Sequence, residues 1–256
     1  MKSVKLTFLS IALIAAMSAC NSSKKMSAPA TAEPTKPEET EFWEPVPAIV
    51  KPGMTPSDAP SDAIVLFDGK GSGEWEQADG KDFAWTIADG AMTVKPKTGD
   101  VHTKRSFGDC QLHIEWRTPA EVSGTSQGRG NSGIFLQERY ELQVLDNYDN
   151  RTYSNGQASS IYKQSVPLVN ACKGPGDWQT YDVVYKAPVF DASGNRTSPG
   201  YITVFHNGVL TQNHTEIKGT TEYIGWPKNI AHGEAPIKLQ DHGNLVSYRN
   251  IWIRRL

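Results

Sequence analysis

The chain has 256 residues, of which 38% are hydrophobic, and a formal net charge of −2. This length is enough for one sizeable domain and a tail. The near-zero net charge gives no support for a nucleic-acid partner, because proteins of that class usually carry a basic excess. Seven tryptophans are many for this length, and tryptophan offers sugar rings a flat apolar face as well as filling cores.

The first 20 residues show the order of features found in bacterial lipoprotein signals. Two lysines precede an apolar run at residues 6–16, which is too short for a stable membrane-spanning helix. Small residues then lead to Cys20, as in a lipobox whose cysteine becomes the lipidated first residue. An ordinary signal peptide with a chance cysteine is the alternative. We expect a signal over residues 1–20, membrane attachment through a lipid on Cys20, and a location in the cell envelope, periplasmic or at the cell surface.

Residues 21–60 have the composition of a linker. They are dense in Pro, Ala, Ser, Thr, Glu and Lys, and large apolar residues are scarce before Phe42. Such a segment buries too little apolar surface to offset the entropy of ordering it. We interpret it as a flexible tether that precedes one domain over residues 61–256.

From residue 63 onward the chain consists of short β-type runs divided by Gly, Asp, Asn and Pro turns. Two hairpin signals stand out, Ala88-Asp89-Gly90 and Asn207-Gly208. The expected strands, besides two adjacent ones within residues 130–146, cover residues 64–67, 85–87, 91–94, 110–117, 159–162, 178–185, 201–206, 209–210, 237–240 and 246–253. No sustained helical period or fixed repeat appears after the signal, so we predict an all-β sandwich or jelly roll.

Residues 130–146 carry more chemistry than strands usually do. Strand side chains alternate between two faces, which places Glu141 and Gln143 together on one face. An ordinary half-exposed strand has small polar residues or Thr and Lys there, whereas this face has a carboxylate and an amide, with Arg139 in step before them. We expect this face to line a sugar-binding groove.

The motifs that carry a family resemblance occur in this order: Leu66-Phe67-Asp68-Gly69, the hairpin at residues 85–90, Asn131-Ser132-Gly133-Ile134, Tyr140-Glu141-Leu142-Gln143-Val144-Leu145-Asp146, Trp178-Gln179, Asn207-Gly208, Leu239-Gln240-Asp241-His242-Gly243 and Tyr248-Arg249-Asn250-Ile251. As an ordered set they resemble the DUF1080 family, or 3-keto-disaccharide hydrolase domain, over about residues 61–256. Members are described as 3-keto-glucoside 1,2-lyases and 3-keto-2-hydroxy-glucal hydratases. The resemblance implies a concanavalin A-like jelly roll, which agrees with the strand pattern, and residues 187–200 look like an insertion.

Cleavage of a 3-keto-glycoside by elimination needs a base for the C2 proton, a donor or cation near the enolate oxygen, and an acid for the leaving group. Glu141 is the candidate base, and His242 is a second candidate for base or acid because His titrates near neutral pH. Arg139, Lys163 or a divalent metal held by Glu, Asp or His would stabilise the enolate. No His pair has metal-ligand spacing, so the metal stays unassigned.

Other residues are candidates for binding the sugar. Asn131, Gln143 and Gln240 would bind hydroxyl groups, and Trp226, in a Gly-Trp-Pro loop, would be a stacking platform. Each has a plainer alternative. A strand Glu is often only solvated, and Asp241-His242-Gly243 is equally a turn whose Asp caps its own backbone.

Two other functions fit the same sequence. A non-catalytic carbohydrate-binding module would use the same face without turnover. A direct glycoside hydrolase would pair Glu141 with Asp146, but a spacing of five places them on opposite faces unless a bulge intervenes.

Three smaller expectations concern packing. Cys110 and Cys172 are either a disulfide or two separate thiols. His113 and Glu115 are expected to form a surface pair. The tryptophans expected in the core are Trp75, Trp85, Trp116 and Trp252.

Overall fold

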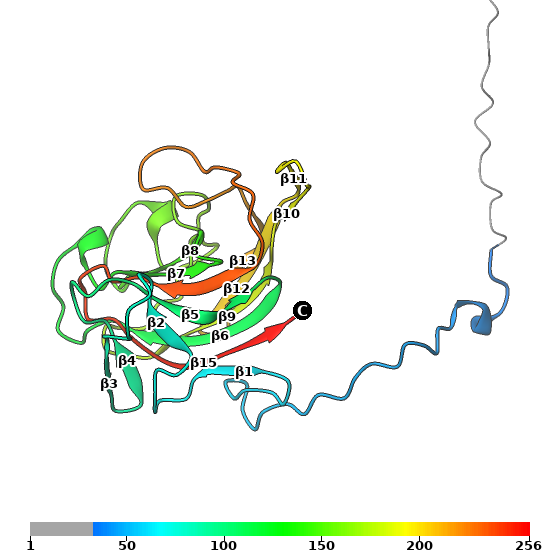
Figure 1. The fold of residues 1–256 in the computed structure, drawn as a ribbon, viewed down its shortest axis with the longest axis horizontal. Coiled ribbons are helices and arrows are strands. Elements are labelled where there is room, and N and C mark those ends of the chain that lie inside the picture. Colours follow the sequence, from blue (N-terminus) through cyan, green and yellow to red (C-terminus); the bar gives the residue numbers. More distant parts are fainter. Residues whose placement is uncertain (1–32) are drawn as a thin grey trace, which may run out of the picture. The chain divides into compact units, whose positions relative to one another are not determined.

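The structure is a computed structural model that describes residues 33–256, and its larger compact unit runs from Ile49 to Leu256 (Figure 1). The predicted signal and Cys20 lie outside the described residues. No helix among residues 33–256 is long and apolar enough to cross a membrane. The elements are η1 (Pro37–Thr40), β1 (Ile64–Phe67), β2 (Trp75–Gln77), β3 (Thr86–Ala88), β4 (Ala91–Thr93), β5 (Val101–Phe107), β6 (Cys110–Arg117), η2 (Ser126–Gly128), β7 (Ser132–Leu136), β8 (Tyr140–Val144), η3 (Ser154–Gly156), β9 (Gln179–Lys186), β10 (Val189–Phe190), β11 (Arg196–Ser198), β12 (Gly200–His206), β13 (Val209–Ile217), β14 (Ala235–Leu239) and β15 (Ser247–Arg255).

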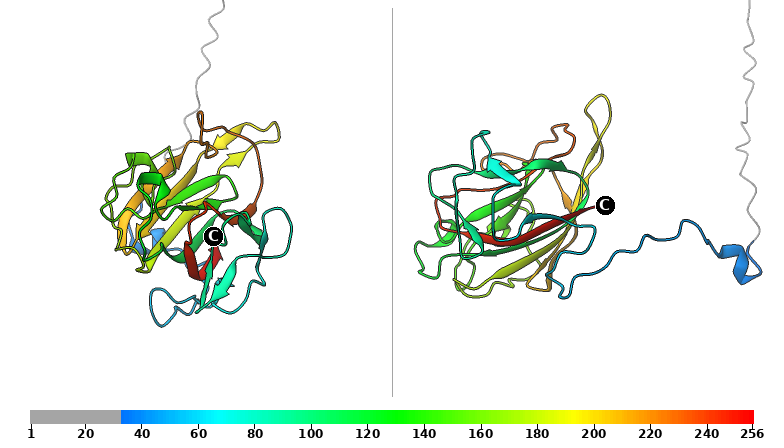
Figure 2. Two further views of the ribbon diagram at one scale, coloured as in Figure 1. Left: turned by 90° about the vertical axis from the view of Figure 1, so that its left-hand side faces the viewer. Right: turned by 60° about the horizontal axis from the view of Figure 1, so that its bottom comes forward.

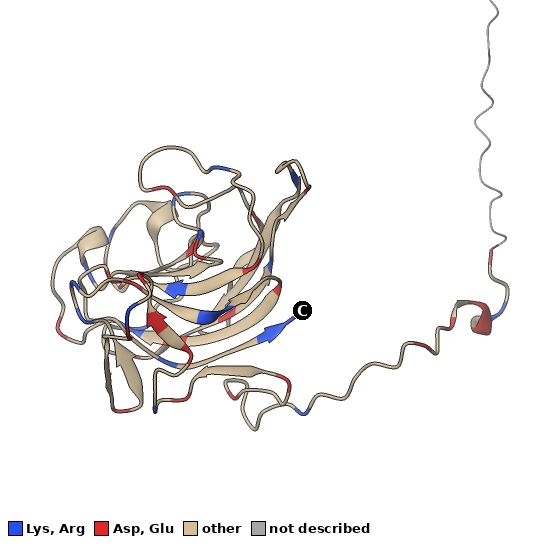
Figure 3. Ribbon diagram, viewed as in Figure 1, with Lys and Arg blue, Asp and Glu red and all other residues tan. Residues whose placement is uncertain are grey.

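Two curved antiparallel sheets face each other across one core (Figures 1 and 2). The eight-stranded sheet has the order β13-β12-β9-β6-β15-β4-β3, with β1 beside β15, and the five-stranded sheet has the order β2-β5-β14-β7-β8. Charges of both signs are interspersed along their strands and loops (Figure 3). The predicted all-β jelly-roll sandwich is confirmed.

Period-two alternation fills the core from both sheets. Leu112, Ile114 and Trp116 of β6 are buried as their spacing predicted, and Leu142 and Val144 of β8 meet them from the smaller sheet. Burying a side chain of this size stabilises the fold by about 1.5–3 kcal/mol. Of the four tryptophans expected in the core, Trp75, Trp85 and Trp116 belong to it. Trp252 is also buried, but on the outer face of the larger sheet, where its ring stacks on His113 (centroids 5.2 Å apart).

Tyrosine hydroxyls tie the two sheets together inside this apolar core. Tyr181 of β9 donates to the carbonyl of Gln143 (2.8 Å), and Tyr248 of β15 donates to the hydroxyl of Ser132 (2.7 Å). A buried hydroxyl without a partner is costly, so these bonds favour one packing arrangement. They fix β7 and β8 against the larger sheet.

Most expected strands are present, and the differences have local causes. Both predicted hairpins form, as β3–β4 and β12–β13, and residues 187–200 contribute the β10–β11 hairpin. Residues 159–162 do not form a ladder strand; Ile161 makes an isolated bridge with Leu142, and the Tyr162 N–H donates to the carbonyl of Glu141 (3.0 Å). Strands β2 and β5 were not predicted, because β2 is short and β5 is rich in polar and basic residues.

His113 and Glu115 form a buried pair and not the surface pair that we expected. His113 is 1% exposed because the segment before β1 covers it; the Ser57 carbonyl in that segment accepts hydrogen bonds from Asn250 and Trp252 (both 2.9 Å). The compact unit therefore includes residues that precede position 61, where composition placed the domain boundary.

The electrostatics of this pair follow from its partners. Burial alone would lower the pKa of His113, but hydrogen bonds to Asp182 and Glu115 raise it to about 9. Burial would raise the pKa of Glu115, but hydrogen bonds from His113, Asn250 and Arg249 lower it to about 2. Both groups are therefore charged at neutral pH.

Cys110 and Cys172 are both free, so of the two alternatives the structure has two separate thiols. Burial raises the pKa of each thiol to about 12. They are therefore unreactive thiols at neutral pH.

Candidate active site

A cavity of about 770 Å³ lies on the outer face of the five-stranded sheet, the face that turns away from the core. Loops around the sheet close over this face, so Glu141 and Gln143 are only 5% and 1% exposed instead of open to solvent. The lining residues are Gln127, Gly128, Asn131, Phe135, Glu141, Gln143, Tyr153, Tyr162, Lys163, Thr221, Tyr223, Gln240 and His242.

Strands β7 and β8 form the floor of the cavity. Their register places Phe135 opposite Glu141 and Gly133 opposite Gln143, so all four lie on one face. A Cβ on Gly133 would stand 2.6 Å from Oε1 of Glu141 and 2.9 Å from the Phe135 ring. Glycine at position 133 therefore provides the space that the Glu141 carboxylate occupies.

Glu141 is a buried carboxyl group that forms no ion pair within the described part of the chain. Burial raises its pKa to about 8; the charge of Lys238 opposes this shift and that of Asp100 adds to it. A carboxyl with such a pKa is able to gain and lose a proton near neutral pH, which is typical of acid–base catalysts.

Tyrosines and one lysine form a wall of the cavity. The Tyr153 and Tyr162 hydroxyls share a hydrogen bond of 2.6 Å, and burial raises the pKa of both phenols, so both remain protonated. Lys163 donates from Nζ to the carbonyl of Tyr223 (2.6 Å) and lies 4.5 Å from the centre of the Tyr223 ring. The loop between β13 and β14 thereby closes on this wall, and its Thr221 hydroxyl accepts the Glu141 N–H (3.0 Å).

A chain of amides lines another side. The Gln143 amide nitrogen donates to Oδ1 of Asn131 and to Oε1 of Gln127 (both 3.2 Å), and Asn131 donates to the Gln127 carbonyl (2.7 Å). The side-chain oxygens of Gln143 and Gln240 are buried without a hydrogen-bond partner among the described residues. Two unpaired acceptors at a cavity wall are suited to hydroxyl donors of a ligand.

His242 lies at the cavity edge, in the turn that follows β14. Asp241 caps the turn by accepting the Gly243 N–H (2.9 Å), as the plainer alternative predicted, and His242 lines the cavity. Its role as a base or acid stays a prediction. The Asp241 carboxylate also accepts the Gly99 N–H (3.1 Å), which anchors the turn. Residues far apart in sequence, Glu141 and His242, therefore share one cavity.

Two predicted site residues lie elsewhere. Arg139 ends the tight β7–β8 turn, where Gln137 and Glu138 have positive φ, and it donates to the Gln137 carbonyl (2.9 Å) instead of lining the cavity. The physical reason is that the turn, and not the period-two alternation of the strand, sets the direction of the Arg139 side chain. Trp226 lines a second, neighbouring cavity.

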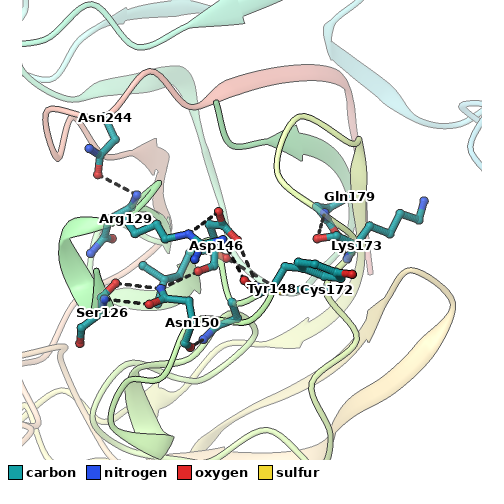
Figure 4. A network of polar contacts seen from close by, with 12 residues as sticks. Ser126, Arg129, Asp146, Tyr148, Asn150, Cys172, Lys173, Gln179 and Asn244 are labelled. Carbon is teal, nitrogen blue, oxygen red and sulfur yellow. Dashed lines mark hydrogen bonds and ion pairs between the residues drawn. The ribbon is translucent and has the colours of Figure 1, made fainter. Parts of the chain in front are cut away.

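Asp146 belongs to a supporting network and not to the cavity (Figure 4). Its carboxylate pairs with Nε of Arg129 (2.8 Å), its carbonyl accepts from Asn150 (2.7 Å), and Asn150 also accepts the Ser126 N–H (2.8 Å). These bonds join the loop before β7 to the loop after β8. They hold the loops that carry Gln127 and Tyr153.

The residues that sequence reasoning missed come mostly from loops. Tyr153, Thr221 and Tyr223 lie in irregular loops, where no periodicity assigns a face. Gln127 lies in the short η2 helix, and Tyr162 lies where we expected a strand and the structure has only an isolated bridge. Tyrosines within polar loops were the available signal. Over residues 33–256 no group of three or more His, Cys, Asp or Glu side chains is arranged to hold a metal ion.

The structure thus combines a jelly-roll sandwich with a tyrosine-walled cavity on its smaller sheet. Residues 62–254 match the family model of the 3-keto-alpha-glucoside-1,2-lyase-like domain, and the chain belongs to this family. The resemblance read from the sequence motifs is confirmed.

Individual relatives agree with this assignment. A 3-keto-disaccharide hydrolase of Bacteroides thetaiotaomicron is 28% identical over 242 residues, which covers 75% of this chain and 78% of the relative. A presumed glycosyl hydrolase of Parabacteroides distasonis, solved at 2.13 Å, is 53% identical with a TM-score of 0.83, covering 86% of this chain and 97% of its own. A second such protein of P. distasonis, 21% identical with a TM-score of 0.55 over 76% and 94% of the two chains, shares the fold.

Proposed function

We propose that this protein cleaves 3-keto-glycosides by C2 deprotonation, β-elimination and hydration. The observation that carries the proposal is the placement of Glu141, a carboxyl buried on the floor of the cavity, where burial raises its pKa to about 8. Such a group is suited to acid–base catalysis on a C–H proton that is unusually acidic. A ketone at C3 gives the C2 proton of the sugar that acidity. The name of the B. thetaiotaomicron relative agrees with this substrate class.

The reaction proceeds in two halves. In the first, a base takes the C2 proton, the electron pair forms an enolate with the C3 carbonyl, and collapse of the enolate forms the C1–C2 double bond. The C1–oxygen bond breaks and the leaving oxygen takes a proton. In the second half, water adds to C1 and a proton returns to C2, so the net change is hydrolysis.

The cavity residues supply these steps. Glu141 in its ionised form takes the C2 proton and returns it during hydration. His242 carries the second proton at the leaving oxygen. Lys163 offers the positive charge for the enolate oxygen, and the Tyr162 hydroxyl offers a hydrogen bond. The unpaired oxygens of Gln143 and Gln240 accept from sugar hydroxyls.

Direct hydrolysis fits the cavity less well. That reaction uses two carboxyl groups on either side of the scissile bond, about 5–5.5 Å or about 6.5–9.5 Å apart. Among the described residues that line the cavity, Glu141 is the only carboxyl, and Asp146 is committed to Arg129. A single carboxyl that gains and loses a proton near neutral pH suits elimination better.

A matched substrate pair tests the proposal. Incubation with 4-nitrophenyl 3-keto-glucoside is expected to release nitrophenol, while the unoxidised 4-nitrophenyl glucoside stays intact. Equal release from both would establish direct hydrolysis instead. Binding of the keto-sugar without release would leave a carbohydrate-binding module.

A further inference from the structure

We propose that the second cavity, lined by Trp226, is the subsite for the leaving group and takes a ring, such as the second sugar of a 3-keto-disaccharide. This inference rests on the proposed function. The second cavity has a volume of about 370 Å³ and shares Tyr153, Tyr162 and Lys163 with the main cavity. A ligand whose first ring lies beside Glu141 therefore reaches the second cavity across this shared wall.

Trp226 has the exposure expected of a stacking platform awaiting a ligand. It is 88% exposed, and no aromatic ring of residues 33–256 packs against it. The apolar face of a pyranose packs on an indole ring because both surfaces leave water. A bound ring at this place would cover surface that the folded chain leaves open.

The loop that carries Trp226 is held in place at its neck. The Thr220 N–H donates to the Lys228 carbonyl (2.9 Å), and Gly219 has a φ of +156° with Lys228 backbone atoms where a Cβ would stand. Lys163 adds a third attachment through the Tyr223 carbonyl (2.6 Å). Trp226 is thus presented from a closed loop beside the shared wall.

Polar groups for ring hydroxyls accompany the tryptophan. Glu222 lines the second cavity, and a hydrogen bond from Thr220 and the neighbouring Lys228 lower the pKa of its carboxyl, so it stays ionised. Asn155 lines the same space. An aromatic face with acceptors at its rim fits a sugar better than a purely apolar group.

Selectivity between leaving groups tests the inference. The readout is the ratio of kcat/KM for a 3-keto-disaccharide to kcat/KM for methyl 3-keto-glucoside, whose leaving group is only methanol. Trp226→Ala is expected to lower this ratio about tenfold, because the variant loses the stacking of roughly one sugar-ring face on the indole. Trp226→Phe retains most of the ratio, and Phe205→Ala, which removes an exposed aromatic from β12, leaves it unchanged. An unchanged ratio in Trp226→Ala overturns the inference.

Failure of the proposed function would look different. If the wild type cleaves neither keto-sugar, calorimetric titration with the unoxidised disaccharide and with methyl glucoside measures the two affinities. These affinities test the proposed subsite independently of catalysis. A preference of the wild type for the disaccharide that disappears in Trp226→Ala supports the subsite. Equal affinities of the wild type and Trp226→Ala for the disaccharide overturn it.

Discussion

The backbone of Gly133 lies against the carboxylate of Glu141, so that a Cβ at position 133 would stand 2.6 Å from Oε1. Gly133→Ala is therefore expected to push the carboxylate away from its place and to lower kcat/KM about a hundredfold, as displacements near 1 Å do. Gly71→Ala is the control, since a Cβ there meets nothing within 4 Å. Wild-type kcat/KM in Gly133→Ala would show that the position of Glu141 does not matter.

Glu141 should destabilise the fold as pH rises. Its pKa is about 8 in the folded protein, whereas the ordinary value of a Glu side chain is 4.5, so between these pH values the unfolded chain has lost a proton that the folded chain keeps. Stability contributed by the neutral form is full below pH 4.5 and falls as pH rises toward 8. Glu141→Gln, which stays neutral, is expected to be more stable than the wild type by about 2–4 kcal/mol at pH 8 and similar at pH 4. Urea unfolding at the two pH values measures this, and equal gains at both would contradict the raised pKa.

On the opposite sheet, His113 should contribute stability that depends on pH in the same direction for a different reason. Its pKa is raised from 6.5 to about 9 by Asp182 and Glu115 against the effect of burial. The contribution is complete below pH 6.5 and is lost as pH rises through 9, amounting to about 2–3 kcal/mol. His113→Gln should show a smaller loss of unfolding free energy between pH 6 and pH 10 than the wild type. Parallel curves for the two proteins would rule out a charged His113.

Membrane attachment is a prediction from the sequence at residues 1–20. Labelled fatty acid should be incorporated into the full-length chain in a bacterial host and the protein should sediment with membranes. Cys20→Ala is expected to lose the label and to appear in the soluble fraction. Cys172→Ala, which removes a half-buried free thiol in the domain, is the control. Membrane association of Cys20→Ala equal to that of the wild type would contradict lipidation at this residue.

The fold and the floor of the cavity were predictable because both follow from period-two alternation. The alternation alone, without any tertiary structure, predicts that Glu141 and Gln143 share one face of the strand. It also predicts that Leu142 lies on the opposite face, in the core. The walls were not predictable in this way. Tyr153 and Tyr162 meet through loops whose path depends on contacts far along the chain.

Burial of polar residues was the least predictable feature. The alternation in β6 places His113 away from the core, and only the segment around Ser57, folded back over that face, buries it. The prediction that Arg139 lines the groove was wrong for a related reason, because two residues with positive φ turn the chain immediately before it. In both cases tertiary structure, and not local periodicity, decides the environment.

The most direct test of the central claim compares the wild type with Glu141→Gln on one 3-keto-glucoside. Glutamine keeps the size of the side chain and removes its ability to exchange a proton. We predict that release of the leaving group falls about 10²–10⁴-fold, the usual contribution of one acid–base group, while calorimetry shows affinity for the keto-sugar retained. Undiminished release by Glu141→Gln would contradict the assignment of Glu141 as the residue that moves the C2 proton.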